Sequence, residues 1–302
     1  MLMYLFSITN IEEVSHASHR ILTEQYDLII DSCKKTDDLD KAVHDIRKAS
    51  KRMRAILRML KPDLYPDVYL KENNFLKETS RKLSVARNFH VFEEEFRNIV
   101  SAGIIELSDD VVTTISNILK EKKDDAFELL TGLDMFDQIS QKVTEAKQRI
   151  DEIDYLMLGP HTVYKGIGKV FAWGQRQMVH SQQFPTDENL HEMRKRIKTL
   201  MYLVRLIKDV SPEFLTGYYK GLKSASLALG EDHNMAELGD YIDTLDDETV
   251  PVEEKLKLES YISSQRQQIQ LEVWPQIAKL YTGQAGEFSK RVKAYWLLGR
   301  QG

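Results

Sequence analysis

Lysine and arginine side chains are concentrated in two short segments of a chain that is acidic overall. The first segment, HDIRKASKRMRAILRMLK from His44 to Lys61, has seven Lys or Arg and one acid, a net charge of +6. The second, HEMRKRIKTLMYLVRLIK from His191 to Lys208, has six and one, a net charge of +5. The whole chain has 42 bases and 47 acids, so the remainder has 29 and 45, a net charge of -16. Ammonium and guanidinium groups gathered in this way can bind phosphates and other anions through charge-assisted hydrogen bonds.

Helical periodicity places most of these cations on one side of each segment. At 100° per residue, the polar side of the first segment fits within an arc of about 120°. It holds His44, Arg47, Lys48, Lys51, Arg54 and Arg58, and the apolar residues take the opposite side. The polar side of the second segment holds His191, Arg194, Lys195, Lys198, Tyr202 and Arg205. Basic residues therefore coincide at the third, fourth, seventh and fourteenth positions after each histidine.

The repeated like-charge arrangement favours a ligand over a merely solvated helix face. A solvated face usually mixes signs, because Glu–Lys pairs four residues apart stabilise a helix, whereas like charges at that spacing destabilise it. The first basic face extends from Arg47 to Arg58, about 16 Å along the helix axis. This length suits an extended polyanion better than a single phosphate. Nucleic acid remains an alternative, although Tyr202 is the one aromatic residue on either face and base stacking usually needs several.

The elements that position these faces are predicted to be helices throughout. Helical spacing of apolar residues indicates helices at about 11–31, 39–60, 67–87, 89–102, 109–131, 134–158, 161–181, 187–209, 212–229 and 232–245. The stretch 252–299 is expected to form two helices, either bent near Pro275 or divided at Gly283–Gly286. No segment shows the alternation of a strand with hairpin turns. The predicted fold class is therefore all-α, a helical bundle.

The two basic segments also indicate an internal duplication. His44 and His191 are 147 residues apart, and Gly159-Pro160 is a clear break near the middle of the chain. We expect one domain over residues 1–302, with half-repeats at about 1–158 and 160–302. Its two pseudo-symmetric bundles would place the basic helices face to face around a basic central channel.

The amino-acid composition indicates a globular protein and the cellular compartment in which it is expected. The 302 residues are 42% hydrophobic, which is ordinary for a globular protein with a core. The single cysteine, Cys33, excludes an intramolecular disulfide and suggests a reducing compartment. No apolar run approaches the length of a membrane span, so we expect a cytoplasmic protein.

The basic helices and several further motifs resemble the CHAD family, the conserved histidine α-helical domain. The pattern H-x-x-R-K-x-x-[KR] occurs in both segments. LKETSRKLSVARNFHVF at Leu76 and KGLKSASLALGEDHN at Lys220 are similar to the family's equivalent elements in the two halves. VYKGIGKVFAWG at Val163 is similar to its basic helix that opens the second half. Together the matches extend from about residue 10 to nearly the C-terminus.

The resemblance implies binding of inorganic polyphosphate in a basic central channel. It implies as ligand contacts His44, Arg47, Lys48, Lys51 and Arg58, then His191, Arg194, Lys195, Lys198 and Arg205. Less directly it adds Arg54, Arg81, Arg87, Lys165, Lys169, Tyr202 and Lys223. The chain departs from the family pattern at Asn88, His90 and Asn234, where aspartates are usual, and at Gly166 and Gly168, where bases are common.

These observations lead to three hypotheses of function. The first is non-enzymatic binding of polyphosphate, with no cofactor, metal or catalytic residue. Such binding would recruit the protein to polyphosphate stores and associate it with polyphosphate granules. The second is a phosphohydrolase or phosphotransferase acting on the same anion, which normally needs carboxylates that hold Mg²⁺. The sequence predicts no acid on either basic face. The third is a nucleic-acid-binding protein. His16 and His19 are treated as an incidental pair of surface histidines.

Overall fold

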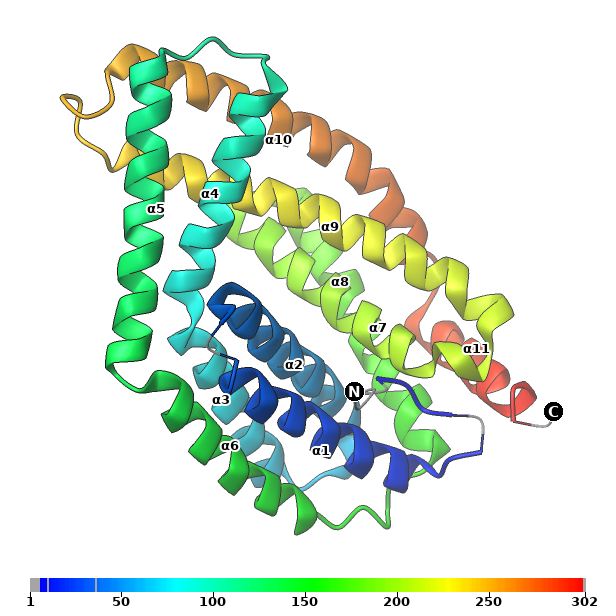
Figure 1. Cartoon of the computed structure of the whole chain (residues 1–302). Coiled ribbons are helices and arrows are strands. Elements are labelled where there is room, and N and C mark those ends of the chain that lie inside the picture. Colours follow the sequence, from blue (N-terminus) through cyan, green and yellow to red (C-terminus); the bar gives the residue numbers. More distant parts are fainter. Residues whose placement is uncertain (1–5, 10, 36, 301–302) are drawn as a thin grey trace.

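The described part of the chain is built from α-helices, with no strand among its residues (Figure 1). The structure is a computed structural model and describes residues 6–9, 11–35 and 37–300. The first helices are α1 (Val14–Cys33), α2 (Leu39–Leu60), α3 (Pro66–Lys82), α4 (Ser84–Ala102), α5 (Asp109–Gly132) and α6 (Met135–Asp151). They are followed by α7 (Pro160–Gln183), α8 (Asp187–Ile207), α9 (Pro212–Asp243), α10 (Val252–Leu280) and α11 (Ala285–Leu298). The all-α fold class is confirmed.

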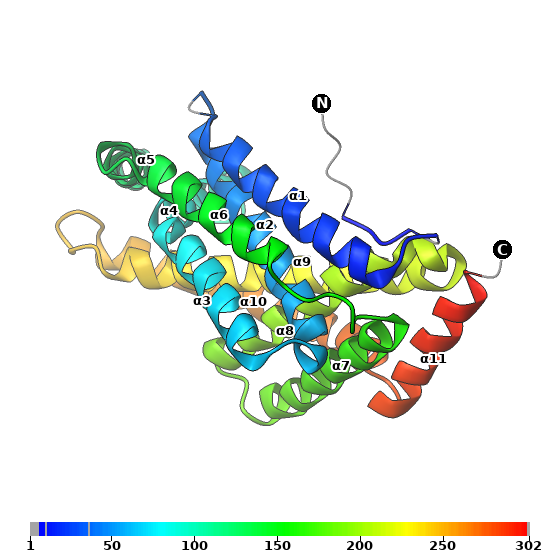
Figure 2. The same ribbon diagram turned by 90° about the horizontal axis from the view of Figure 1, so that it is seen from below.

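The two basic helices, α2 and α8, lie at the centre of the arrangement (Figures 1 and 2). They pack against each other, and both also pack against α7. The remaining sides of α2 are covered by α1, α3 and α4, while α9 covers α8. Because both central helices have neighbours on several sides, their basic faces are surrounded by protein rather than presented on an open surface.

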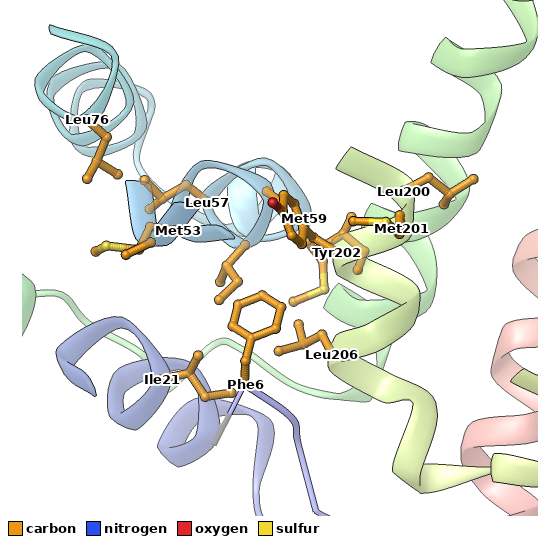
Figure 3. Close-up of a cluster of buried hydrophobic side chains, with 14 of the residues drawn as sticks. Phe6, Ile21, Met53, Leu57, Met59, Leu76, Leu200, Met201, Tyr202 and Leu206 are labelled. Atoms are coloured by element: carbon orange, nitrogen blue, oxygen red, sulfur yellow. The ribbon is translucent and has the colours of Figure 1, made fainter. Parts of the chain in front are cut away.

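A large hydrophobic core holds these central helices in place. The apolar backs of α2 and α8 are almost completely buried, as Met53, Leu57, Leu200 and Leu203 illustrate. Phe6, from the segment before α1, packs between α1, α2 and α8 (Figure 3). Burying each such side chain contributes about 1.5–3 kcal/mol. The core therefore fixes which faces of α2 and α8 point away from it.

A second, smaller core lies at the far end of α4 and α5. There Phe92, Phe96 and Ile115 pack with Leu238 of α9 and Leu258 of α10. Figure 1 shows α4 and α5 running side by side to meet the loop end of α9 and α10. This core joins elements from the two ends of the sequence and brings α4 and α9 together next to the basic helices.

Most predicted helices are confirmed, with differences at their ends. The break between α3 and α4 lies at Leu83 rather than at residue 88, and α6 ends at Asp151 rather than at 158. The predicted break at about 230–231 is wrong, because α9 continues without interruption from Pro212 to Asp243. At the C-terminus the chain divides at the predicted glycines, where Gly283 has a φ of 86°. Pro275 lies inside α10.

The two glycines that replace expected bases at the start of α7 allow close helix packing. A Cβ atom on Gly166 would lie 2.2 Å from the backbone oxygen of Met59 in α2. A Cβ atom on Gly168 would lie 2.8 Å from the Cβ atom of Ser289 in α11. Separations this short are not tolerated without displacement, so glycine lets α7 lie directly against α2 and α11.

We predict that Gly166→Ala destabilises the protein although alanine favours helices. The added methyl group must push α7 away from a backbone atom of α2, which should cost about 1–3 kcal/mol of unfolding free energy. Gly217→Ala in α9 is the matched control, because its Cβ atom would have no neighbour within 4 Å. That change should be neutral or stabilising by about 0.5–1 kcal/mol. Chemical denaturation of both variants measures the difference, and equal effects would contradict the close packing at Gly166.

Candidate anion-binding site

Four helices form a closed ring around the basic faces. α2 packs against α8 and α4, and α9 packs against the same two helices. Cationic side chains enter this ring from three of the helices. α2 supplies Arg47 and Lys51, α8 supplies Arg194 and Lys198, and α4 supplies Arg87. We call these five residues the basic cluster.

The pKa values of the two lysines show that the five charges act on one another. Burial is the main cause that lowers the pKa of Lys51 well below its ordinary value, and Lys198, Arg47, Arg194 and Arg87 add to the decrease. Burial likewise lowers the pKa of Lys198 to about 8, again with Arg194, Arg47 and Arg87 contributing. Charges from α2, α4 and α8 therefore converge on one place.

No member of the basic cluster forms an ion pair with a carboxylate of the described residues. All five side chains are nevertheless half-buried. Outside the cluster, half-buried cations on helices other than α2 and α8 are paired with carboxylates, as Lys123 is with Glu93 at 2.6 Å and Arg149 with Glu72 at 2.7 Å. Buried charges are costly unless they are paired. The cluster therefore lacks the anions that its cations require.

Two arginines of the cluster are held in place with unused hydrogen-bonding capacity. Arg47 donates to the backbone oxygen of Ser80, near the C-terminal end of α3. The Nε atom of Arg194 is buried and has no hydrogen-bond partner. Arg194 also explains the glycine that suggested a break in α9, because a Cβ atom on Gly230 would lie 3.3 Å from that Nε atom. Gly230 thus makes room for the guanidinium group instead of ending the helix.

Carboxylates outside the two basic faces act on the cluster, although the sequence has no acid within the arcs of these faces, residues 44–58 and 191–205. Glu237 of α9 acts on the charges of both Arg47 and Arg194 without reaching ion-pair distance. Burial raises the pKa of Glu237, and the two arginines partly offset that increase. A second acid, Asp45, acts on His44 and Lys48 at the edge of the cluster. Glu94 and Asp40 act on Arg87, also without forming an ion pair with it. The five cations thus have carboxylates nearby, but none at ion-pair distance.

His44 and His191, which begin the two H-x-x-R-K patterns, lie in different surroundings. His44 is exposed, and its pKa is lowered by partial burial and by nearby cations, chiefly Arg87. His191 is half-buried against His233 of α9, with 3.9 Å between ring centroids. Burial and neighbouring cations lower the pKa of His191 to about 4 and that of His233 to about 3. Both are therefore neutral at pH 7, and the Nδ1 atom of His191 has no hydrogen-bond partner.

Two groups of cations lie beyond the cluster on the basic helices. At the C-terminal part of α2, Arg54 donates to Asn73, and Arg58 lies 4.3 Å from the ring centre of Trp173 in α7. Arg196 of α8 contacts the same ring at 3.2 Å. In the other group, Arg205 and Lys48 lie near the buried Arg52. Arg196 pairs with Glu192 at 2.9 Å. The described residues provide no carboxylate partner for Lys48, Arg54, Arg58 and Arg205, so half-buried unpaired cations extend along both helices.

Several predicted site residues lie away from the cluster. Arg81 is exposed and pairs with Glu78 at 2.7 Å. Lys195 is exposed and pairs with Glu192 at 2.6 Å, although its charge acts on His191. Tyr202 is 6% exposed and packs edge-on against Phe6. Three further lysines are exposed and are not among the main charges acting on Lys51 or Lys198, namely Lys165, Lys169 and Lys223.

Five residues at the site were missed by the sequence analysis, namely Arg52, Trp173, Arg196, His233 and Glu237. Arg52 and Arg196 lie outside the arcs of the basic faces, so helical periodicity assigned them elsewhere. The other three come from α7 and α9, whose positions depend on tertiary packing. The motif LGEDHN did draw attention to the segment that contains His233.

Other kinds of site find less support in the described residues. No group of three or more His, Cys, Asp or Glu residues there could hold a metal ion. His19 is paired with Asp151 at 2.7 Å. Among the helices of the described residues, none is both long and apolar enough to cross a membrane.

Comparisons with known proteins identify a matching family and two structures with a similar fold. The family model described as CHAD domain matches residues 20–243. A CHAD domain structure from the plant Ricinus communis is similar with a TM-score of 0.69 and 15% identity, covering 94% of this chain and 96% of that one. PptA from Streptomyces chartreusis has a TM-score of 0.65 and 12% identity, covering 90% of this chain and 100% of that one. No curated protein matches the sequence.

We predict that removing one charge from the cluster stabilises the ligand-free protein. Lys198→Met keeps the aliphatic stem but removes the ammonium group. At pH 7 its free energy of unfolding should therefore exceed that of the wild type by at least about 1 kcal/mol, which raises Tm by ~2 °C. Because the folded-state pKa of Lys198 is about 8, the charged ammonium group destabilises the folded protein to its full extent below pH 8. This destabilisation disappears as pH rises toward the unfolded value of about 10.4.

The measurement is denaturation of wild type and variant at pH 7 and pH 10. The advantage of Lys198→Met should shrink at the higher pH. Lys223→Met, at an exposed position of α9, is the control and should change stability little. A destabilised Lys198→Met variant at pH 7 would contradict the unpaired state of the cluster.

Proposed function

The chain belongs to the CHAD domain family, and we propose that it binds inorganic polyphosphate without hydrolysing it. Polyphosphate binding is a known property of this family. The observation that carries the proposal is the basic cluster, in which five half-buried cations from three helices lack carboxylate partners. A chain of phosphates would supply the missing negative charge and accept hydrogen bonds from the guanidinium and ammonium groups.

The bound polymer would lie in a channel between the basic faces of α2 and α8. The cluster would form its centre, where the ring of α2, α4, α8 and α9 surrounds the ligand. Arg54 and Arg58 continue the line of cations toward the C-terminal end of α2. A linear polyanion can follow such a path because its charge repeats along its length, whereas a single small anion would occupy one part of it. The half-repeats would then contribute one wall each.

The state of the aromatic residues favours polyphosphate over nucleic acid. Base stacking requires accessible ring faces. Trp173 is already in contact with the guanidinium groups of Arg58 and Arg196, and Tyr202 is buried. Neither ring offers a free platform beside the cations. The site thus provides charge and hydrogen bonds but little stacking surface.

The carboxylates near the cluster favour binding over catalysis. Phosphoryl transfer commonly uses several carboxylates that hold divalent ions next to the reacting phosphate. Near the cluster, burial raises the pKa of Glu237, while Asp40 and Glu94 both contact His90. These carboxylates do not form a group that could hold a metal ion among the described residues. We therefore propose a binding module that recruits the protein to polyphosphate stores in the cytoplasm.

We predict that either basic helix can be disabled with a similar loss of affinity. One variant combines Arg47→Glu with Lys51→Glu, and the other combines Arg194→Glu with Lys198→Glu. Each should weaken binding of long-chain polyphosphate at least about tenfold, since about 1.4 kcal/mol suffices for that factor. The salt dependence should also flatten, because fewer counterions are released on binding. Titration at several salt concentrations measures both effects.

A matched control has the same change in total charge at exposed positions away from the cluster. Lys120→Glu combined with Lys142→Glu meets this requirement on α5 and α6 and should retain most of the affinity. Single-stranded DNA of equal charge is the second control and should bind more weakly to the wild type. Equal affinity for DNA would favour the nucleic-acid alternative. Normal binding by one of the two cluster variants would exclude a ligand held between both helices.

We predict no release of orthophosphate from polyphosphate. The purified protein is incubated with the polymer and Mg²⁺, Mn²⁺ or Zn²⁺, and free phosphate is assayed over time. The Arg194→Glu and Lys198→Glu double variant serves to detect contaminating phosphatase, which would act equally in both samples. Turnover that disappears in this variant would establish the enzymatic alternative.

A further inference from the structure

Lys51 and Lys198 combine two properties that rarely occur together. Their amines lie half-buried among arginines, and neither has a carboxylate partner among the described residues. Lysines in such surroundings lose their proton more easily, and the neutral amine is a nucleophile. At the same place, Arg47, Arg87 and Arg194 offer guanidinium groups suited to phosphate. A nucleophile therefore lies beside groups that can hold a phosphorylated reagent.

We propose that Lys198 is a site of covalent acylation by small acyl phosphates, with Lys51 beside it as a second site. The arginines of the cluster would hold the phosphate group of the reagent. The adjacent acyl carbon would then be within reach of a lysine amine. The proposal rests on the proposed function to the extent that the cluster must have affinity for phosphate.

The reaction needs no partner other than the acyl phosphate and water. The lone pair of the neutral Nζ atom attacks the carbonyl carbon, and a nitrogen–carbon bond forms. The bond between that carbon and the phosphate oxygen breaks, and orthophosphate leaves with the bonding electrons. The nitrogen loses one proton to water, so the product is a neutral amide. Arginines beside the departing phosphate would stabilise its negative charge.

The charges around Lys198 come from every helix of the ring. The cations are Arg194 on α8, Arg47, Lys48 and Lys51 on α2, and Arg87 on α4. The opposing carboxylates act on these arginines: Glu237 of α9 acts on Arg47 and Arg194, and Glu94 and Asp40 act on Arg87. With its pKa at about 8, half of the Lys198 amines are neutral at pH 8. A lysine with the ordinary pKa of about 10.4 is neutral to only about 0.4% at that pH. A less basic amine is also a weaker nucleophile. With a Brønsted slope of about 0.4–0.5, as for thiols, a rate advantage of about tenfold remains.

Acylation would regulate the proposed binding. Each amide removes one positive charge from the cluster and adds bulk between α2 and α8. Both changes oppose the entry of a polyanion. Exposed lysines such as Lys165, Lys169 and Lys223 would lack this effect because they do not belong to the cluster. An acyl phosphate would thus modify the same cluster that is proposed to bind polyphosphate, and would thereby reduce that binding.

The test uses acetyl phosphate and the intact protein at pH 8. Mass spectrometry of peptides follows the acetylated fraction at each lysine over time. Lys198 should react at least about tenfold faster than Lys165, Lys169 and Lys223, which serve as internal references. Long-chain polyphosphate should suppress the reaction at Lys198 and leave the reference lysines unaffected. An acylating reagent without phosphate, the N-hydroxysuccinimide ester of acetate, should show a smaller preference for Lys198.

The outcomes separate this inference from the proposed function. If titration shows polyphosphate binding but Lys198 reacts no faster than the exposed lysines, the acylation proposal fails alone. If Lys198 is acetylated selectively but polyphosphate does not bind, the proposed function fails. An equal preference with both reagents would exclude guidance by phosphate. Finally, acetyl phosphate should weaken polyphosphate binding severalfold in the wild type, but not in a Lys51→Arg and Lys198→Arg variant compared with its own untreated sample.

Discussion

Repulsion between the cations of α2 and α8 is the constraint around which this fold is organised. Two unit charges 4 Å apart repel by about 1 kcal/mol in water and by ~4 kcal/mol at an effective dielectric constant of 20. The structure sustains this repulsion because the backs of the same helices are strongly apolar. α2 alone buries Val43, Ile46, Met53, Ile56 and Leu57, each worth about 1.5–3 kcal/mol. Core burial therefore outweighs repulsion on the opposite face, and the two basic faces stay together.

The other helices complete the ring around the basic cluster but provide no carboxylate at ion-pair distance from its cations. The second core, at the far end of α4 and α9, ties these helices together through Phe96 and Leu238. It thereby places Arg87 next to the cations of α2 and α8. Glycines allow close approach where a side chain would interfere, as Gly166 does between α7 and α2 and Gly230 does beside Arg194. Outside the cluster, acids are used for local pairing, as Glu72 pairs with Arg149.

The sequence was informative where the relevant property belongs to a single helix. The basic faces follow from the spacing of residues 44–58 and 191–205, because a helix fixes the directions of its own side chains. The resemblance to a family added Arg87, which no periodicity could connect to α2. Glu237 and Trp173 were not predictable, since their positions depend on how α9 and α7 pack. The error at Gly230 has the same origin, because a glycine that gives room to Arg194 looks in the sequence like one that ends a helix.

The unpaired cluster also links stability to ligand binding. A ligand that binds only the folded state stabilises it by an amount that grows with its concentration. Here the stabilisation would have a specific origin, because a polyanion would remove the repulsion that the ligand-free protein carries. Pairing each cation permanently with a carboxylate, in the manner of Lys123 and Glu93, would remove the same repulsion but would also occupy the site. Burial, with the neighbouring cations adding to it, lowers the pKa of Lys198, and no paired carboxylate offsets that decrease. The same absence of counterions would thus account for the proposed affinity for polyphosphate, the expected cost in stability and the proposed reactivity of the lysines.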